Sequence, residues 1–209
     1  MPMPKISKRS ATVIIIVVSA AIIWIIKSVL IDGSFRMDPV EARSKGNRQA
    51  PIQIVEHIDF QCPACAYGAK LLKEFMQKNP DQVFLQLHHF PLAMHKHAIT
   101  ASIYAECAAR QKKFWEFHDL LIENQDQWKS MEDARPAFQS FAEQVGLKSN
   151  ALNKCIADPA TEAAILQERT LGTERGIKST PTYFVNGEMT VGATSLMKIL
   201  NQASNKPSS

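Results

Sequence analysis

The sequence is poor in several features that mark common classes of protein. Its 209 residues include only four cysteines, its net charge at pH 7 is only +4, and no segment repeats another. The basic residues are dispersed and form no patch, which argues against a nucleic-acid partner. No second close pair of cysteines accompanies Cys62 and Cys65, so a tetrahedral zinc site would have to recruit histidines. We therefore expect no metal and no cofactor.

One long apolar run, Ala11 to Ile31, lies near the N-terminus. As an α-helix it would cross the roughly 30 Å apolar core of a bilayer. Lys5, Lys8 and Arg9 precede it, which holds the N-terminus in the cytoplasm and directs the rest of the chain outside. A cleaved signal peptide is the alternative, but no clear small-x-small cleavage site follows the run. We expect residues 1–31 to form a cytoplasmic N-terminus and a single-pass signal anchor in the cell membrane.

The orientation of this anchor makes the remaining chain extracytoplasmic, which means periplasmic in a Gram-negative cell. Residues 32–50 are polar and contain proline and glycine without an apolar period. They are expected to form a linker, with an edge strand or a short helix as the alternative. One folded domain is expected over residues 51–203, and residues 204–209 form a polar tail.

The residue pattern of the folded domain predicts an α/β protein. A strand, a helix and a second strand come first, a run of helices follows, and two strands and a helix end the domain. Asn186-Gly187 between the last two strands is a strong signal for a hairpin turn. The strands are expected at 52–58, 82–90, 182–185 and 189–191, and the helices at 66–79, 98–110, 114–123, 134–145, 149–157, 160–175 and 195–202.

Cys62 and Cys65 lie in the sequence Phe60-Gln61-Cys62-Pro63-Ala64-Cys65, where a predicted strand ends and a predicted helix begins. Unpaired backbone N–H groups and the helix dipole favour negative charge there, so the pKa of Cys62 should be lowered. Pro63 suits the first helical position, where its missing N–H costs nothing. Cys65 is one turn further on and can close a disulfide with Cys62. A redox dithiol is the favoured interpretation, with a zinc half-site or two inert buried thiols as alternatives.

Four stretches of the sequence resemble the DsbA-like thiol–disulfide oxidoreductases, and together they extend over Pro51 to Asn201. The resemblance implies a thioredoxin fold with an all-helical insertion, here at about residues 95–175. The stretches are Val55-Glu56 leading into Cys62-Pro63-Ala64-Cys65, Phe90-Pro91-Leu92 followed by His95 and Ala98, Lys113-Phe114-Trp115-Glu116-Phe117-His118-Asp119-Leu120-Leu121, and Ser179-Thr180-Pro181-Thr182-Tyr183-Phe184-Val185-Asn186-Gly187.

The same resemblance assigns roles to residues outside the dithiol. Pro181 should be a cis proline packed against the disulfide, and the backbone of Thr180 should pair with an extended substrate. Glu56 should lie buried beneath Cys65 and exchange a proton with it, the alternative being an exposed carboxylate on the strand. Pro63 and Ala64 complete the expected substrate-contacting surface.

The expected function is an oxidase that introduces or exchanges disulfides in cysteine-containing exported polypeptides. The resemblance implies that a quinone-linked membrane protein would reoxidise it. Pro63-Ala64 lacks the histidine of the strongest oxidants of the family, and Thr180 replaces the valine typical of that subgroup. These differences keep open a reductase or isomerase that serves particular partners. A metal-binding carrier and a binding module with a permanent disulfide are further alternatives.

Cys107 and Cys155 lie on different predicted helices of the insertion. Outside the cytoplasm they could form a second, structural disulfide. The alternative is two buried thiols that act as small apolar side chains. The sequence leaves both interpretations open.

Overall fold

The computed structural model describes residues 39–204. The predicted membrane anchor over 1–31 lies outside these residues and stays a prediction. The same holds for the predicted tail over 204–209, of which only residue 204 is described. Within residues 39–204, none of the helices combines the length and the apolar character needed to cross a bilayer.

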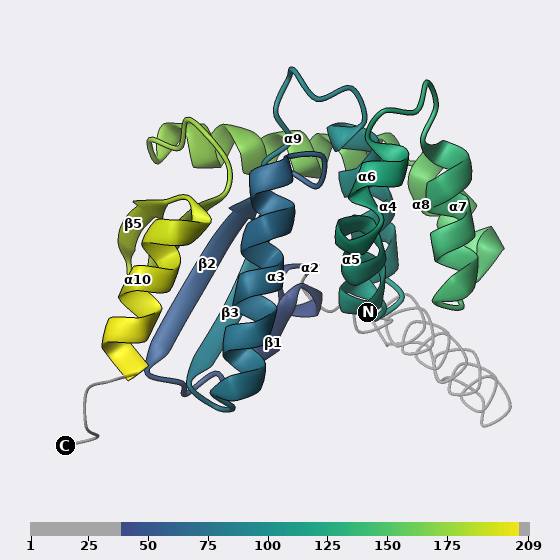
Figure 1. Cartoon of the computed structure of the whole chain (residues 1–209). Coiled ribbons are helices and arrows are strands. Elements are labelled where there is room, and N and C mark those ends of the chain that lie inside the picture. The colour runs from purple at the N-terminus through teal and green to yellow at the C-terminus, as the bar shows by residue number, and fades with distance from the viewer. Residues whose placement is uncertain (1–38, 205–209) are drawn as a thin grey trace, which may run out of the picture. The chain divides into compact units, whose positions relative to one another are not determined.

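Five strands form one mixed sheet in the order β1-β3-β2-β4-β5 (Figure 1). β2 and β3 run parallel, whereas β1, β4 and β5 each pair antiparallel with a neighbour. Apolar residues of the central strands, among them Ile54 and Leu85, are buried because helices cover the sheet. The strands span Ser44–Gly46 (β1), Ile52–Ile58 (β2), Val83–His89 (β3), Thr182–Val185 (β4) and Glu188–Val191 (β5).

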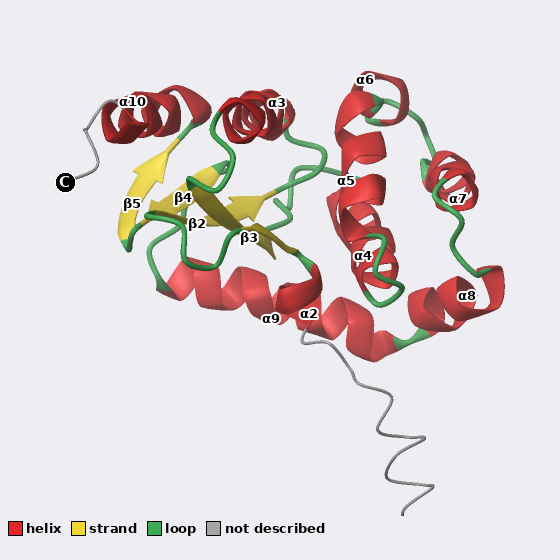
Figure 2. Cartoon of the chain, turned by 90° about the horizontal axis from the view of Figure 1, so that it is seen from below, coloured by secondary structure: helices red, strands yellow, loops and turns green. Residues whose placement is uncertain are grey.

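Helices cover both faces of the sheet, with α3 and α10 on one face and α2 and α9 on the other (Figure 2). The helices α4 to α8 pack beside the sheet around a core of buried aromatic and alanine residues. Their place between β3 and β4 confirms the predicted thioredoxin fold with a helical insertion. The helices span Pro39–Ala42 (α2), Pro63–Lys78 (α3), Ala98–Ala109 (α4), Phe114–Glu123 (α5), Gln125–Trp128 (α6), Arg135–Gln144 (α7), Ser149–Ala157 (α8), Pro159–Glu174 (α9) and Ala193–Ser204 (α10).

The segment from α2 to β1 is folded onto the sheet, so the expected linker is wrong over residues 39–46, where the alternative of a short helix and an edge strand holds. Residues 32–38 lie outside the described residues. β1 extends the sheet as an edge strand beside β3, and the side chain of Arg43 is almost completely buried. The guanidinium of Arg43 contacts the carboxylates of Glu106 and Glu168. Both carboxylates come from residues far along the chain, so the local sequence gives no sign of them. The polar composition therefore suggested a solvated linker, whereas Arg43 is a buried charge paired with carboxylates.

Cys107 of α4 and Cys155 of α8 form a disulfide, which decides between the two alternatives left open by the sequence. Both residues are buried within the helical insertion. The bond closes a loop with a sequence separation of 48 residues, so it restricts the unfolded chain and stabilises the insertion.

Candidate active site

Cys62 and Cys65 lie at the junction between β2 and α3. Cys62 precedes the first turn of α3 with an extended backbone, and Pro63 begins the helix. The backbone N–H groups of Cys65 and Ala66 donate to the carbonyl oxygen of Cys62 at 3.0 and 3.2 Å. Both cysteines are free and buried, Cys65 completely and Cys62 with 8% of its surface exposed. The first thiol therefore reaches the surface at a helix N-terminus while the second is enclosed.

The surroundings separate the acidities of the two thiols. A hydrogen bond from the Cys65 thiol is the main cause that lowers the pKa of Cys62, to about 5; partial burial opposes it, and Thr180 and the N–H groups of Cys65 and Ala64 add to it. Burial raises the pKa of Cys65 well above its usual range, and the adjacent Cys62 raises it further. At neutral pH the pair therefore consists of a Cys62 thiolate and a Cys65 thiol.

A loop from the C-terminal part of the domain closes against Cys62. The Thr180–Pro181 peptide bond is cis, and Thr180 is buried. The Sγ atom of Cys62 lies 3.5 Å from the carbonyl oxygen of Thr180 and, in its thiol form, donates a hydrogen bond to it. The N–H of Gly192 donates to the carbonyl oxygen of Pro181 at 2.9 Å and so ties the loop to the start of α10. These hydrogen bonds therefore hold the loop in place beside the reactive sulfur.

Glu56 of β2 is buried, so the alternative of an exposed strand carboxylate is wrong. It pairs directly with Tyr183 of β4, which places the two side chains on the same face of the sheet. Burial raises the pKa of Glu56 to about 7, and the nearby Lys45 and Tyr183 partly offset this rise. The carboxyl group therefore gains and loses its proton near neutral pH.

Tyr183 relates Glu56 to the dithiol. Burial raises the pKa of Tyr183 far above its usual range, and the negative charges of Glu56 and Cys65 raise it further. The hydroxyl oxygen lies against α3 at Gly68, three residues after Cys65, where a Cβ atom would approach it to 2.4 Å. The structure thus brings Glu56 and Cys65 to one side of the sheet, and the proton exchange between them stays a prediction.

The helical insertion contributes a contact to the dithiol that sequence reasoning did not find. Gln125, the first residue of α6, is buried, and its Nε2 donates to the carbonyl oxygens of Phe60 and Cys62 at 2.7 and 3.0 Å. These carbonyls flank the turn that leads into α3. A glutamine in a four-residue helix carries no local signal for such a role, because both acceptors lie more than sixty positions earlier.

A second contact that the sequence did not predict stabilises the turn before Cys62, and it involves a buried residue at the end of β2. The completely buried Asp59 accepts hydrogen bonds from the N–H of Gln61 at 2.7 Å and the N–H of Leu92 at 2.8 Å. The ring Nδ1 of His95 lies 2.8 Å from the same carboxylate. Asp59 thereby connects the end of β2 to the segment that follows β3.

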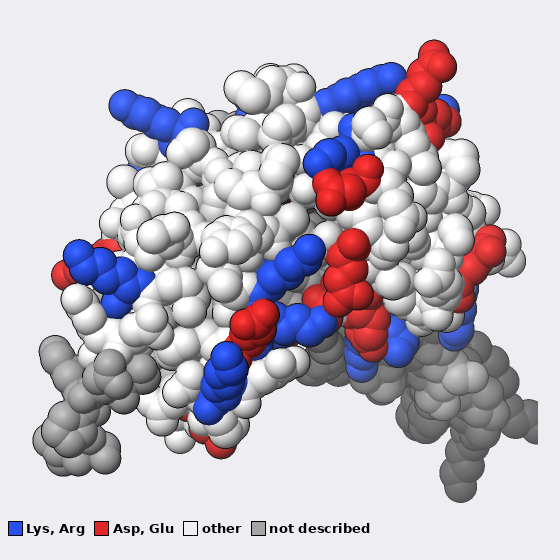
Figure 3. Space-filling view, in the orientation of Figure 1, with Lys and Arg blue, Asp and Glu red and all other residues white. Residues whose placement is uncertain are grey.

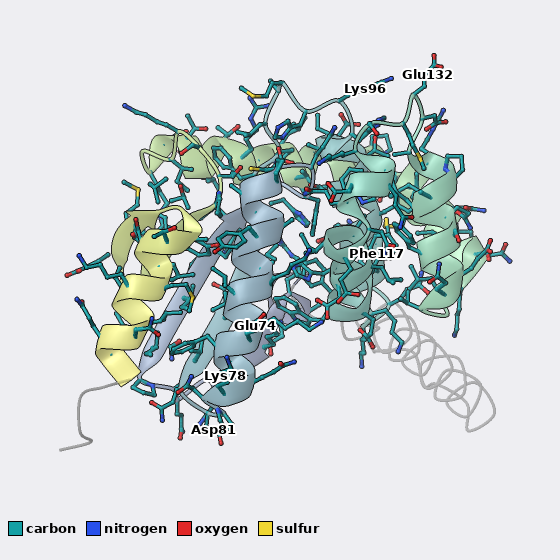
Figure 4. All side chains as sticks on the ribbon, viewed as in Figure 1. Glu74, Lys78, Asp81, Lys96, Phe117 and Glu132 are labelled. Carbon is teal, nitrogen blue, oxygen red and sulfur yellow. A yellow bond between two sulfur atoms is a disulfide. The ribbon has the colours of Figure 1, made fainter. Side chains whose placement is uncertain are left out.

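Two loops of the insertion border the site. The N–H of His97 donates to Oε1 of Gln61 at 2.6 Å, and Nε2 of the same histidine lies 2.7 Å from the carbonyl oxygen of Met131. Lys96 and Glu132 lie near the tips of these loops, beyond the N-terminal end of α3 (Figure 4). The loops are therefore fastened to the residue that precedes Cys62.

Within residues 39–204, no three His, Cys, Asp or Glu side chains gather as metal ligands would.

Comparison with known proteins places the chain among thioredoxin-like proteins. A family model described as Thioredoxin matches residues 39–202. The Na(+)/H(+) antiporter NhaA 3 of Salinispora tropica is 33% identical over 160 residues, a match that covers 76% of this chain and 24% of the relative. A putative protein-disulfide oxidoreductase of Rickettsia bellii is 29% identical over 147 residues, which covers 69% of this chain and 57% of the relative. The chain therefore spans a quarter to somewhat over half of these relatives, so their whole activities are not carried over to it.

A solved structure supports the fold independently. The crystal structure of Wolbachia pipientis α-DsbA1 superposes with a TM-score of 0.65 at 20% sequence identity, over 77% of this chain and 89% of that one. At this identity the similarity establishes the shared fold. It agrees with the resemblance on which the predicted insertion rests.

Proposed function

The chain belongs to the thioredoxin family, and on this basis we propose that it is a thiol–disulfide oxidoreductase that introduces or exchanges disulfides in cysteine-containing exported proteins. One observation carries the proposal: the surroundings lower the pKa of Cys62 to about 5 and raise that of Cys65. Two structural thiols would not need different pKa values. A nucleophilic thiol and the thiol that resolves its mixed disulfide do need them.

The oxidised enzyme reacts by two successive exchanges. A substrate thiolate attacks Sγ of Cys62 and breaks the Cys62–Cys65 disulfide, so that Cys65 leaves and a mixed disulfide forms. A second substrate thiolate then attacks the substrate sulfur of that mixed disulfide, and Cys62 leaves as a thiolate. The substrate has gained one disulfide, and the enzyme has gained two electrons as a dithiol.

The low pKa of Cys62 favours this oxidising direction. A low pKa of Cys62 stabilises the reduced enzyme, because Cys62 is then a thiolate. The start of α3 and the Cys65 thiol stabilise the negative charge of that thiolate. In the reverse direction Cys65 resolves the mixed disulfide, and its raised pKa means that it needs a base. Glu56, with a pKa of about 7, is the group proposed to take that proton.

The surface around Cys62 suits an extended polypeptide. Pro63 and Ala64 are exposed beside the sulfur, and the Thr180–Pro181 loop faces it from the other side. We assign the backbone of Thr180 the role of pairing with the substrate main chain. Side chains next to the substrate cysteine would then contact Pro63, Ala64 and Pro181.

The proposed location is the outer side of the cell membrane. The apolar run Ala11 to Ile31 supports an anchor, and the Cys107–Cys155 disulfide is typical of compartments in which disulfides persist. A membrane protein that passes electrons to quinone is the proposed reoxidant, on the basis of the family resemblance. A reductase or isomerase that serves particular partners is the alternative, since Pro63-Ala64 lacks the histidine of the strongest oxidants.

The reduction potential of the Cys62–Cys65 pair tests the proposal. The full chain is equilibrated in glutathione buffers and its thiols are quantified after acid quenching, with Cys62→Ser as the control without a dithiol. We expect a potential above about −200 mV, on the side of oxidising family members and away from the about −270 mV of thioredoxin. A value near that of thioredoxin would favour the reductase, and failure to exchange with glutathione would contradict both.

A further inference from the structure

His95, in the loop that follows β3, contacts a buried carboxylate next to the dithiol, and the proposed mechanism gives it no role. Its side chain is 21% exposed, and its ring Nδ1 lies 2.8 Å from Oδ2 of Asp59. Asp59 is completely buried directly after β2, three residues before Cys62. His95 therefore connects the surface to a carboxylate enclosed beside the turn that leads to the dithiol.

The polar groups of Asp59 hold this turn and reach the second thiol. Its carbonyl oxygen accepts the N–H of Cys62 at 3.1 Å, and its Oδ1 accepts the N–H of Gln61 at 2.7 Å. Its own N–H donates to the sulfur of Cys65. Burial is the main cause that raises the pKa of Cys65, and hydrogen bonds from Thr180 and from the N–H of Asp59 partly offset this rise.

The loop after β3 closes on the other carboxylate oxygen of Asp59. Oδ2 accepts the N–H of Leu92 at 2.8 Å in addition to the contact with the His95 ring. The N–H of His95 in turn donates to the carbonyl oxygen of Leu92 at 3.1 Å, so both donors come from one tight turn. Because a carboxylate only accepts, Nδ1 of His95 carries a proton and donates it whether the ring is neutral or charged.

The buried carboxylate of Asp59 depends on these donors. Water screens the charged side chains that lie on the face shown in Figure 3, whereas Asp59 has no exposed surface. Within residues 39–204, His95 is the only basic side chain with a nitrogen within 4 Å of this carboxylate. Without His95 the carboxylate would keep only backbone donors in a buried place, and it would shift towards water together with the backbone of Asp59.

We propose that His95 is a positioning residue for Cys65: its Nδ1–H holds the Asp59 carboxylate and so fixes the Asp59 N–H where it stabilises the Cys65 thiolate. The inference rests on the proposed function, because this thiolate forms when a substrate thiolate attacks Sγ of Cys62. A bond then forms between the substrate sulfur and Cys62, the Cys62–Cys65 bond breaks, and its electron pair stays on Cys65. A thiolate that accepts a hydrogen bond leaves faster, so His95 speeds formation of the mixed disulfide.

The test is the reaction of the oxidised full chain with glutathione, whose thiolate attacks Cys62 and expels Cys65. Initial rates of mixed-disulfide formation are measured by rapid acid quench and mass spectrometry. His95→Leu should slow the reaction about tenfold, because the leaving thiolate loses an aligned donor. His95→Asn is the matched control, since its amide places a donor near the position of Nδ1, and it should react close to the wild-type rate. Met94→Leu changes the exposed neighbour in the same loop and should have no effect.

A second measurement does not depend on activity. The full chain is prepared with isotope-labelled aspartate, and the NMR signal of the Asp59 amide is identified by its loss in Asp59→Asn. In the reduced protein this amide should exchange slowly with solvent, because it donates to a buried sulfur. His95→Leu should speed the exchange and shift the amide proton upfield, whereas His95→Asn keeps both near the wild-type values. His95→Ala deletes the same donor and replaces His95→Leu if that variant does not fold.

The outcomes separate this inference from the proposed function. An oxidised wild-type protein that never forms the mixed disulfide would contradict the proposed function, while the Asp59 amide still judges His95. An unchanged amide in His95→Leu, or a changed amide with an unchanged rate, would overturn the positioning role alone. A His95→Asn variant as slow as His95→Leu would overturn it too, because the loss would then not come from the missing donor.

Discussion

Gly68 of α3 approaches the hydroxyl group of Tyr183 so closely that a Cβ atom at position 68 would lie 2.4 Å from that oxygen. Tyr183 in turn pairs with Glu56 across the sheet. The missing side chain at position 68 therefore lets α3 lie against a buried hydroxyl and the carboxyl group beside it. This contact links the helix that carries the dithiol to its proposed proton acceptor.

Gly68→Ala should therefore destabilise the protein by about 1–3 kcal/mol, because the added methyl group forces Tyr183 or α3 to move. The sign is informative, since Gly to Ala within a helix ordinarily stabilises by about 0.5–1 kcal/mol. Urea unfolding of the reduced protein measures the change. Tyr183→Phe removes the oxygen involved and should recover most of the loss when combined with Gly68→Ala. A stabilising Gly68→Ala would show that the contact does not constrain the helix.

Glu56→Gln should stabilise the reduced protein at alkaline pH and leave its stability near pH 4 unchanged. The pKa of Glu56 is raised in the folded state from 4.5 to about 7. The contribution of the protonated carboxyl group is thus complete below about pH 4.5 and is lost as pH rises through 7. Removing the ionisable group should add about 3 kcal/mol at pH 8. Denaturant unfolding at both pH values checks this, and equal effects at pH 4 and pH 8 would contradict a raised pKa.

Cys62 should react with iodoacetamide with a pH midpoint near 5, while Cys65 stays unreactive in the folded protein. Cys65→Ala leaves no side-chain donor at position 65 and should raise the midpoint of Cys62, because the thiol of Cys65 is the main group that lowers it. The same variant should accumulate mixed disulfides with substrates, which mass spectrometry detects. A midpoint near the usual value for a free cysteine, about 8.5, would remove the basis for an activated nucleophile.

Replacing Cys107 and Cys155 together by alanine should destabilise the protein by about 4 kcal/mol in the chain-entropy model, given the loop that the disulfide closes. The alkylation midpoint of Cys62 should stay unchanged, because neither residue contributes to its pKa. Unfolding by denaturant and alkylation of the folded double variant provide the two readouts. A large shift of the Cys62 midpoint would mean that the insertion disulfide also controls the redox site.

Gln125→Leu should cost about 1–3 kcal/mol and disturb the turn before α3, because the carbonyl of Phe60 loses its donor in a buried place. Gln127→Leu, at an exposed position of the same short helix, is the matched control and should have little effect. Thermal unfolding and the Cys62 alkylation rate compare the two variants. Equal behaviour would show that the amide does not hold the turn.

Local patterns predicted the parts of the fold that depend on neighbouring residues. The strand predicted at 52–58 matches β2, and Asn186-Gly187 occupies the hairpin between β4 and β5 with positive φ angles of 50° and 88°. By contrast, α6 was not predicted, and β1 was foreseen only as the alternative to a linker. Each is three or four residues long and owes its place to contacts with distant segments.

The sequence by itself determined the position of Cys62 at the start of a helix and that of Cys65 one turn further on, because both follow from spacing and from where an apolar strand gives way to a helical pattern. Only the tertiary structure decided that Glu56 is buried beside Tyr183 and that Cys107 bonds Cys155. The physical reason is that pKa shifts and side-chain pairings depend on which groups are buried together, away from water. Residues far apart in the chain create such an environment only when the chain folds.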